Sequence, residues 1–395
     1  MERNKILTKP LNARTPLSIP SLKGNEWKYV KECLDTGWVS SVGAFVDRFE
    51  GEFAEMLGTG HTLSTVNGTA ALHISLIVAG VQPDDEVLVS DMTFIAPVNS
   101  IRYAGAWPVL IDAEPDYWQM DVNRVIDFLE NGCNWDGKAL RNIETGRRIG
   151  AIVPVHILGH PVDMDPLLAV ARKFSLPVIE DATESLGAMY KGRTVGTLGD
   201  ISCFSFNGNK LITTGGGGMI ATNDPVMARR ARHLTTQAKT DPLEYAHDEV
   251  GYNYRLTNVL AAIGCAQLER LADHISAKLE IAGCYSEALS GIDGITVMAE
   301  AEWASSVFWM YTVLIDEAKT GFTSRDLMAR FAELNIETRP LWQPMHLSEV
   351  HKESQASIGD VSEHLCQTAL SLPCSVETTR EQQARVISTI TRDDG

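Results

Sequence analysis

Between residues 60 and 225, short β-rich runs alternate with segments of helical periodicity, and this alternation constrains the fold more than any other feature. The predicted strands are His61–Val66, Glu86–Ser90, Pro108–Asp112, Ile149–Val155, Pro177–Glu180, Ile201–Phe206 and Met219–Thr222. The predicted helices between them are Thr69–Ala79, Ala96–Ala104, Asp121–Leu129 and Met164–Phe174. Strands separated by helices of this length form β-α-β crossovers, so we expect an α/β fold with a mostly parallel central sheet and helices on both faces.

The last third of the chain predicts a smaller C-terminal α+β domain. A helical pattern begins near Thr257, a good N-cap residue, and continues to Leu271. Strands are predicted at Ile295–Met298 and Val307–Ile315, and helices at Ser324–Leu334 and Ser362–Leu370. A chain of 395 residues is long enough for two hydrophobic cores. We therefore expect an N-terminal arm (residues 1–20), a large domain (21–255) and a small domain (256–395).

Composition narrows the class of protein. The formal net charge of -17 argues against nucleic acid and anionic membranes as partners. The seven cysteines form no C-x-x-C pair, which indicates free thiols in a reducing compartment and no zinc or other metal site. No apolar stretch approaches the ~20 residues that span a bilayer. Residues Met1–Ser18 lack the apolar core of a signal peptide, so a cytoplasmic location is predicted.

Two residues at strand ends suggest nucleophilic and electrostatic chemistry. Lys210 follows a buried-looking strand and precedes a Gly-rich turn. A lysine there is either a solvated surface charge or, if burial lowers its pKa, a Schiff-base nucleophile. Asp181 ends a buried strand, at the edge where open α/β sheets bind ligands. It is placed either to pair with a protonated ring nitrogen or to cap a loop.

Two further segments suggest binding of a flat, phosphorylated molecule. Gly68 and Thr69 open a helix directly after a strand, where free N–H groups suit a phosphate, although a plain helix cap gives the same pattern. Phe94 follows the next strand and is either a ring that stacks on a heteroaromatic ligand or a core residue. A phosphate cradle, a stacking ring, a carboxylate and a lysine together are what a pyridoxal 5'-phosphate site requires.

Six stretches then carry a resemblance that extends from about Leu17 to Pro373. They are Thr36-Gly37-Trp38-Val39-Ser40-Ser41, NGTAALH from Asn67, EDATESLGA from Glu180, FSFNGNK from Phe204, GYNYRLTN from Gly251 and RPLWQPMH from Arg339. In this order they resemble the DegT/DnrJ/EryC1/StrS sugar aminotransferases, which are fold-type I pyridoxal-phosphate enzymes. The resemblance implies a two-stage, ping-pong transamination with L-glutamate as amino donor.

The resemblance also implies roles for individual residues. Lys210 is then the lysine that binds the cofactor and moves the proton, and Asp181 is the partner of the pyridine nitrogen. The predicted phosphate contacts are Gly68, Thr69 and Ser205, and the stacking ring is Phe94. Asn253 is expected to complete the phosphate site of a neighbouring subunit, which implies a homodimer with shared active sites.

One predicted cofactor residue departs from the family pattern. Glu184 stands where the family more often has Gln or His. A carboxylate there would repel a phenolate on the cofactor ring, so Glu184 is either protonated or turned elsewhere.

The motifs also suggest a substrate. NGNKLITTGGGGM, TTQAK from Thr235, HDEVGYNYRLTN from His247 and GWVSSVGAFVDRFE from Gly37 resemble enzymes of bacillosamine and legionaminic acid synthesis. These aminate C4 of a UDP-linked 4-keto-6-deoxy-N-acetylhexosamine, whereas GDP-perosamine synthases share much of the same pattern. Arg255, Arg339 and His346 are candidates for the sugar-nucleotide diphosphate, the arginines being equally compatible with surface ion pairs. Trp38 and Ser40 either close over the sugar or form a structural turn.

Three other classes are disfavoured. Related 3-dehydratases carry histidine in place of Lys210. A regulatory relative that keeps the fold and the cofactor without turnover is disfavoured by the intact Lys210, Asp181 and Asn253. A nicotinamide oxidoreductase would need a G-x-G-x-x-G motif after the first strand, which is missing.

Overall fold

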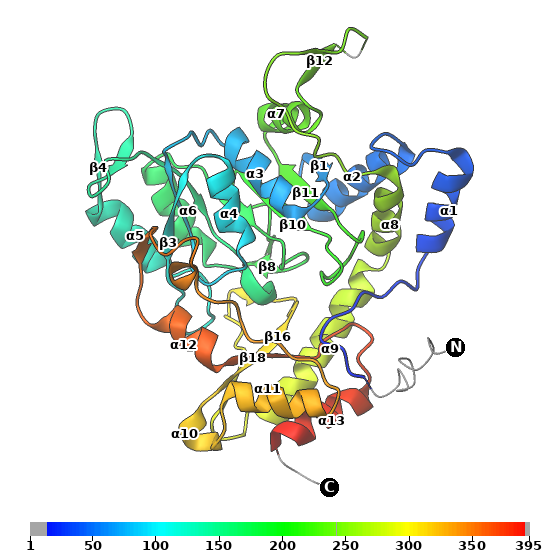
Figure 1. Cartoon of the computed structure of the whole chain (residues 1–395), viewed down its shortest axis with the longest axis vertical. Helices are drawn as coiled ribbons and strands as arrows, with labels where there is room; N and C mark the ends of the chain where they lie inside the picture. The colour runs from blue at the N-terminus through cyan, green and yellow to red at the C-terminus, as the bar shows by residue number, and fades with distance from the viewer. Residues whose placement is uncertain (1–13, 242, 392–395) are drawn as a thin grey trace, which may run out of the picture.

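The computed structural model describes residues 14–241 and 243–391 (Figure 1). Most of the predicted N-terminal arm, residues 1–13, therefore lies outside the described residues. Among the helices described, none is long and apolar enough to cross a membrane.

A twisted central sheet forms the larger part of the molecule. Its strands are β1 (His61–Thr65), β11 (Gly218–Thr222), β10 (Ile201–Ser205), β7 (Ile179–Asp181), β6 (Ile149–Val153), β2 (Glu86–Ser90), β3 (Trp107–Ile111) and β17 (Gln355–Ser357), in that spatial order. A parallel bridge between Ile152 and Val178 joins the two four-stranded halves. Only β11 runs antiparallel to its neighbours, so the predicted mostly parallel sheet is confirmed.

Helices cover both faces of this sheet, which explains the unbroken apolar strands. The covering helices include α2 (Ala44–Leu57), α3 (Gly68–Val78), α4 (Ala96–Tyr103), α5 (Val122–Asn131), α6 (Met164–Lys173) and α7 (Pro225–Thr235). In β2, Val87 and Val89 belong to the core that includes α3 and α4, whereas Leu88 belongs to the core that includes α2, α5 and α6. Every residue of β2 is buried for this reason.

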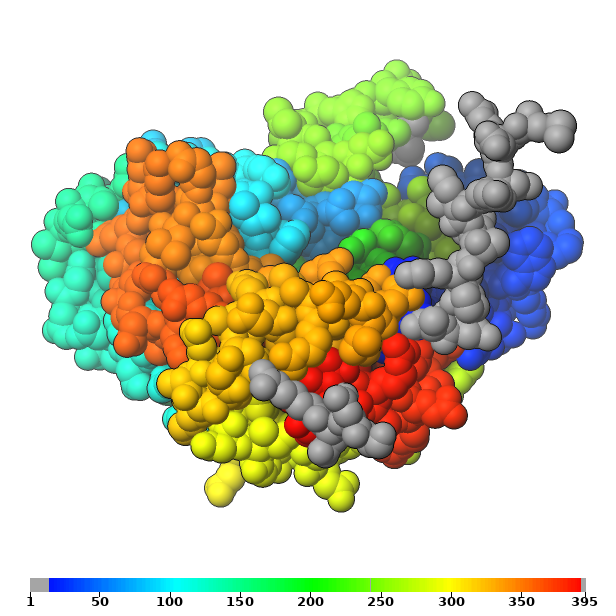
Figure 2. All heavy atoms as spheres, turned by 60° about the horizontal axis from the view of Figure 1, so that its bottom comes forward, coloured from blue at the N-terminus to red at the C-terminus, as the bar shows by residue number. Residues whose placement is uncertain are grey.

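The C-terminal part contains an antiparallel sheet of β14 (Ile295–Val297), β16 (Tyr311–Ile315) and β18 (Ala369–Leu372). Its helices are α9 (Leu271–Leu289), α10 (Glu317–Thr320), α11 (Ser324–Glu333), α12 (Val361–Thr368) and α13 (Arg380–Thr391). In Figure 2 this part, coloured yellow to red, forms most of the near face. The helix predicted over residues 362–370 was too long, because the chain becomes extended at Ala369 and pairs with β16.

The predicted helix that starts at Thr257 is divided in two. Thr257 is the N-cap of α8 (Asn258–Leu268), and α9 starts after Arg270. Both α8 and β17 belong to the predicted small domain, but α8 packs against α1 (Glu26–Thr36) and α2, and β17 extends the large sheet. The division of the chain into two domains at residue 256 therefore stays a prediction.

Several short elements were not predicted. They are β4 (Cys133–Trp135), β5 (Leu140–Asn142), β8 (Met189–Tyr190), β9 (Arg193–Thr194), β12 (Lys239–Asp241), β13 (Ala246–His247), β15 (Ala304–Ser305) and the 3-10 turns Ile157–Gly159 and Met345–Leu347. The β12–β13 hairpin projects beyond the body of the molecule at the top of Figure 1.

Candidate active site

A cavity of about 420 Å³ lies at the carboxyl ends of the parallel strands. Seven of the predicted site residues line it: Gly68, Thr69, Phe94, Asp181, Glu184, Ser205 and Lys210. They lie at or just after the carboxyl ends of β1, β2, β7 and β10; of these only β7 and β10 are direct neighbours, with β11 between β1 and β10 and β6 between β7 and β2. The edge where open α/β sheets bind ligands is therefore where these side chains meet.

One end of the cavity is suited to an anion. The side chain of Asn67 caps α3 by accepting the Ala70 N–H at 2.8 Å, and the remaining N–H groups of the first turn carry the positive end of the helix dipole. A Cβ on Gly68 would lie 2.9 Å from Cβ of Ser205, so only glycine lets α3 approach the end of β10 this closely. The helix start and the Ser205 hydroxyl together form an anion cradle on the wall of the cavity.

Asp181 and Phe94 line the middle of the cavity. Asp181 is the last residue of β7 and is buried, and one of its carboxylate oxygens accepts the Thr183 N–H at 3.0 Å. Burial raises the pKa of Asp181, and the bonds from Thr183 and the charge of Lys210 oppose that rise. Phe94 is 54% exposed and hence not a core residue, which leaves its ring free for a flat ligand.

Lys210 lies between a carboxylate and an indole. Its Nζ is 3.4 Å from Oε1 of Glu184 and 4.1 Å from the centre of the Trp309 ring. Oε2 of Glu184 accepts the Leu158 N–H at 2.9 Å, which fixes the carboxylate facing the lysine. Burial raises the pKa of Glu184, and Lys210 and the Leu158 N–H lower it less.

The C-terminal part of the chain contributes two aromatic walls that the sequence interpretation missed. Trp309 donates from Nε1 to the carbonyl oxygen of Asn209 at 2.8 Å and so anchors the turn that carries Lys210. Trp342 also lines the cavity. Trp342 lies in the stretch RPLWQPMH, so the sequence could have indicated it. No pattern around Trp309 indicates a ring that packs on a lysine.

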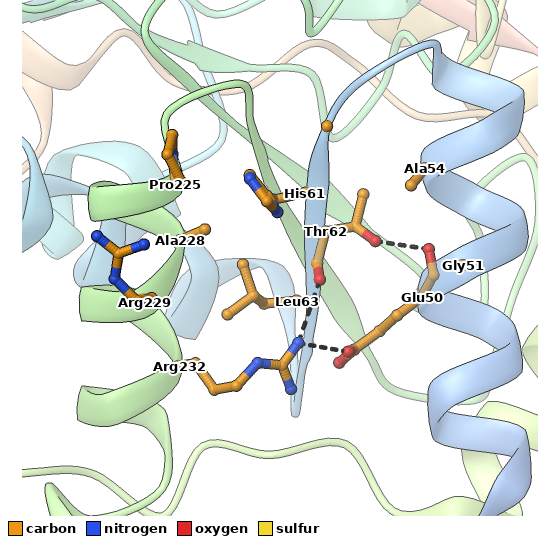
Figure 3. Close-up of a pocket in the computed structure, with 11 residues that line it drawn as sticks. Glu50, Gly51, Ala54, His61, Thr62, Leu63, Pro225, Ala228, Arg229 and Arg232 are labelled. Atoms are coloured by element: carbon orange, nitrogen blue, oxygen red, sulfur yellow. Dashed lines mark hydrogen bonds and ion pairs between the residues drawn. The ribbon is translucent and has the colours of Figure 1, made fainter.

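Arg255, predicted to bind substrate, does not line this cavity. Its Nη1 lies 3.2 Å from Oε1 of Glu50 in a buried position. Oε2 of the same Glu50 pairs with Arg232 at 2.7 Å across a separate pocket between α2, β1 and α7 (Figure 3). Within the described chain Arg255 thus belongs to an internal ion-pair network.

Trp38, Ser40 and Asn253 also lie away from the cavity, on the exposed surface. Asn258 at the start of α8 holds the first two: its Nδ2 donates to the Trp38 carbonyl at 2.8 Å and its backbone N–H to the Ser40 carbonyl at 2.6 Å. Asn253 forms a bridge with Thr236 at the base of the projecting hairpin.

The last two predicted substrate residues are likewise outside the cavity lining. Nδ1 of His346 lies 2.7 Å from Oδ2 of Asp91 and Nε2 lies 3.3 Å from Glu363. Burial alone would lower the pKa of His346, but the two carboxylates outweigh it and raise the pKa. Arg339 is exposed and donates to the carbonyl oxygen of Thr338 at 2.9 Å.

The chain is similar to known proteins along nearly its whole length. The model of the DegT/DnrJ/EryC1/StrS aminotransferase family matches residues 20–391. The GDP-perosamine synthase of Caulobacter vibrioides is 40% identical over 379 residues, 95% of this chain and 97% of that one. The GDP-perosamine synthase of Escherichia coli O157:H7 is 38% identical over 375 residues, again 95% and 97%. A DegT DnrJ EryC1 StrS aminotransferase from Brucella abortus superposes with a TM-score of 0.85 at 27% identity, covering 94% of this chain and 95% of that one.

Proposed function

Because the chain belongs to the DegT/DnrJ/EryC1/StrS aminotransferase family and is therefore a pyridoxal-phosphate-dependent sugar aminotransferase, we propose that it aminates C4 of a nucleotide-linked 4-keto-6-deoxy sugar with L-glutamate as donor. The observation that carries the proposal is the single cavity in which Lys210, Asp181 and the anion cradle meet. The residues fit the cofactor on their own geometry, since Gly68 lets the free N–H groups at the start of α3 lie directly beside Ser205, whose Cβ a side chain at position 68 would meet at 2.9 Å.

When bound, pyridoxal phosphate carries the amino group between donor and acceptor and withdraws electrons from the carbon that loses its proton. In our proposal Gly68, Thr69 and Ser205 hold its phosphate, and Phe94 packs on its ring. Asp181 keeps the ring nitrogen protonated through a desolvated, charge-assisted hydrogen bond. Its burial in the sheet excludes water and strengthens that bond.

Lys210 has two tasks in this proposal. Its Nζ binds the cofactor at rest, and as a free amine it moves one proton between the substrate carbon and the cofactor, first as general base and then as general acid. The indole of Trp309 and the carboxylate of Glu184 hold the free side chain over the cavity. Both half-reactions need the same lysine, which supports a ping-pong course.

The nucleotide has two candidates. We infer GDP as the first, because both relatives described above are named GDP-perosamine synthases and the likeness to each spans 95% of this chain. UDP is the second, favoured by the motifs that resemble the enzymes of bacillosamine and legionaminic acid synthesis. The residues predicted to bind the diphosphate lie outside the cavity lining; they are Arg255, Arg339 and His346. In our proposal they contact the diphosphate only after a second subunit has joined or the conformation has changed.

A homodimer with shared active sites is part of the proposal, as is a cytoplasmic location. Leu243, Tyr245 and Val250 on or beside the β12–β13 hairpin are strongly exposed. Exposed apolar side chains on a projecting element are typical of a contact surface. Asn253 at the base of that hairpin would then reach the phosphate cradle of the second subunit.

The absorption spectrum of the purified protein, recorded before and after L-glutamate is added, tests the core of this proposal. In the wild-type protein we expect a near-visible absorption band, which should change to the band of the aminated cofactor when glutamate is added. The Lys210→Ala protein should lack the first band before any ligand is added. No band after incubation with pyridoxal phosphate would refute the proposal. Competition by GDP against UDP in the second half-reaction then selects the nucleotide.

A further inference from the structure

The cavity holds an unbalanced set of charges. Among the described residues that line it, the charged ones are Asp181, Glu184 and Lys210. Lys210 is the only cation of the three, and its Nζ lies 3.4 Å from Glu184. The ring of His156 does not line the cavity and is bound to Glu180 at 3.2 Å within the fold. Glu184 is thus a carboxylate whose single counter-charge is the lysine that captures the cofactor.

Glu184 has little other support for a negative charge. Its side chain is only 5% exposed, and the hydrogen bond that it accepts besides the lysine comes from the Leu158 N–H. Asp112 offers a contrast within the same protein: it is also buried, but it accepts bonds from Ser362 N–H and Oγ–H, Gly359 N–H and Ala113 N–H. Despite burial, these donors lower the pKa of Asp112. Among the described residues Asp112 has several donors and no ion-pair partner within 4 Å, whereas Glu184 has Lys210 and one backbone donor.

Covalent capture of the cofactor removes that cation. A buried carboxylate without a counter-charge or several donors takes up a proton, because desolvation penalises the charged form. We propose that Glu184 changes its charge together with Lys210, as a carboxylate while the lysine is a free ammonium and as a carboxylic acid while the lysine is bonded to the cofactor. This inference rests on the proposed function of the site.

The exchange conserves atoms and charge. One proton passes from Nζ of Lys210 to Oε1 of Glu184, which leaves a neutral amine and a neutral acid where an ion pair stood. The nitrogen lone pair then bonds to the cofactor's carbonyl carbon, and the two remaining protons of Nζ leave with the carbonyl oxygen as water. When an incoming amine releases the lysine as a neutral amine, Glu184 keeps its proton while that amine acts as general base and then as general acid, and returns the proton to Nζ afterwards. As a neutral acid it also avoids the repulsion that a carboxylate would suffer beside a phenolate.

Difference infrared spectroscopy detects the protonated carboxylic acid by its carbonyl stretch. In the wild-type protein we expect no such band from this site without cofactor and a new band once pyridoxal phosphate has bound. Glu184→Gln should lack the new band. Lys210→Ala removes the cation permanently, so it should show the band even without cofactor. Lys210→Arg keeps a cation that does not deprotonate, so it should show no band in either state.

The same samples separate this inference from the proposed function. The visible spectrum reports cofactor binding, and the Lys210→Ala and Lys210→Arg comparison needs no cofactor. The inference is refuted if Lys210→Ala without cofactor gives the same carboxyl spectrum as Lys210→Arg, or if loaded Glu184→Gln retains the wild-type band. Thermal unfolding of each variant confirms that the spectra come from folded protein. If the wild-type protein fails to bind cofactor while Lys210→Ala gains the band, the charge coupling stands and the proposed function fails.

Discussion

Replacement of Gly68 by alanine tests whether the start of α3 is built to approach a ligand. The added Cβ would lie 2.9 Å from Cβ of Ser205 and 3.3 Å from Cγ2 of Thr183. Carbon atoms prefer separations of about 3.5–4.0 Å, so the helix start has to move by about 0.6–1.1 Å. Overpacking of this kind costs about 1–3 kcal/mol. If the start of α3 moves away from Ser205 and this free energy is lost from phosphate binding, the affinity for pyridoxal phosphate falls about 5- to 150-fold.

Titration of the protein with pyridoxal phosphate and with pyridoxal, which lacks the phosphate, separates the cradle from the rest of the site. Gly68→Ala should lose most of the preference for the phosphorylated form. Gly283→Ala is the matched control, because its Cβ would meet nothing within 4 Å and the residue lies within α9. It should raise the free energy of unfolding by about 1 kcal/mol and leave both affinities unchanged. Equal affinities of wild-type and Gly68→Ala protein for pyridoxal phosphate would refute the predicted cradle.

Three further predictions concern the surroundings of the site. Glu50→Gln leaves the largely buried side chain of Arg255 without its counter-charge and should lower the free energy of unfolding by about 3–5 kcal/mol in urea denaturation. The control Glu52→Gln, from a half-exposed pair with Arg48, should change it by under about 1 kcal/mol. The pKa of His346 is raised in the folded protein, so the protonated ring should stabilise the fold. This stabilisation is complete below the unfolded pKa of about 6.5 and is lost as the pH rises through the folded pKa. The free energy of unfolding of His346→Asn should lack this pH dependence. Asn258→Ala removes the side-chain bonds to the start of α2 and to the Trp38 carbonyl but keeps the backbone bond to Ser40, so limited proteolysis should cut the 38–40 loop at least severalfold faster than in wild type; an unchanged rate would contradict the role of the Asn258 side chain.

The sequence predicted the large sheet well because its strands are buried on both faces. Glu86–Ser90 was predicted with the observed bounds, and the other strands of the large sheet that were predicted differ by one or two residues at one or both ends. The strand β17 was not predicted, because three residues remote in sequence join the sheet edge only through tertiary contact. The division of α8 from α9 was missed for a related reason, since both helices carry apolar residues on several faces and no proline or glycine marks the break at Arg270.

The candidate site shows the same limit. Residues at strand ends, such as Lys210 and Asp181, were predictable because parallel strands bring their carboxyl ends to one edge. The position of Arg255 was not, because the carboxylate that it pairs with, Glu50, lies in α2, far along the chain. The sequence left open where the carboxylate of Glu184 points. The structure shows that it points toward Nζ of Lys210.

The lysine pocket depends on two turns with unfavourable backbone conformations. Leu158 (φ 60°) and Phe308 (φ 45°) are non-glycine residues in the left-handed region, which costs of the order of 1–3 kcal/mol each. The turns meet at Gly159, where a Cβ would lie 2.7 Å from the backbone nitrogen of Trp309. The first turn supplies the N–H that orients the carboxylate beside Lys210, and the second presents the indole that packs on it. Because one turn comes from the large part of the chain and the other from the C-terminal part, the surroundings of the lysine are complete only when the two parts pack together at this point.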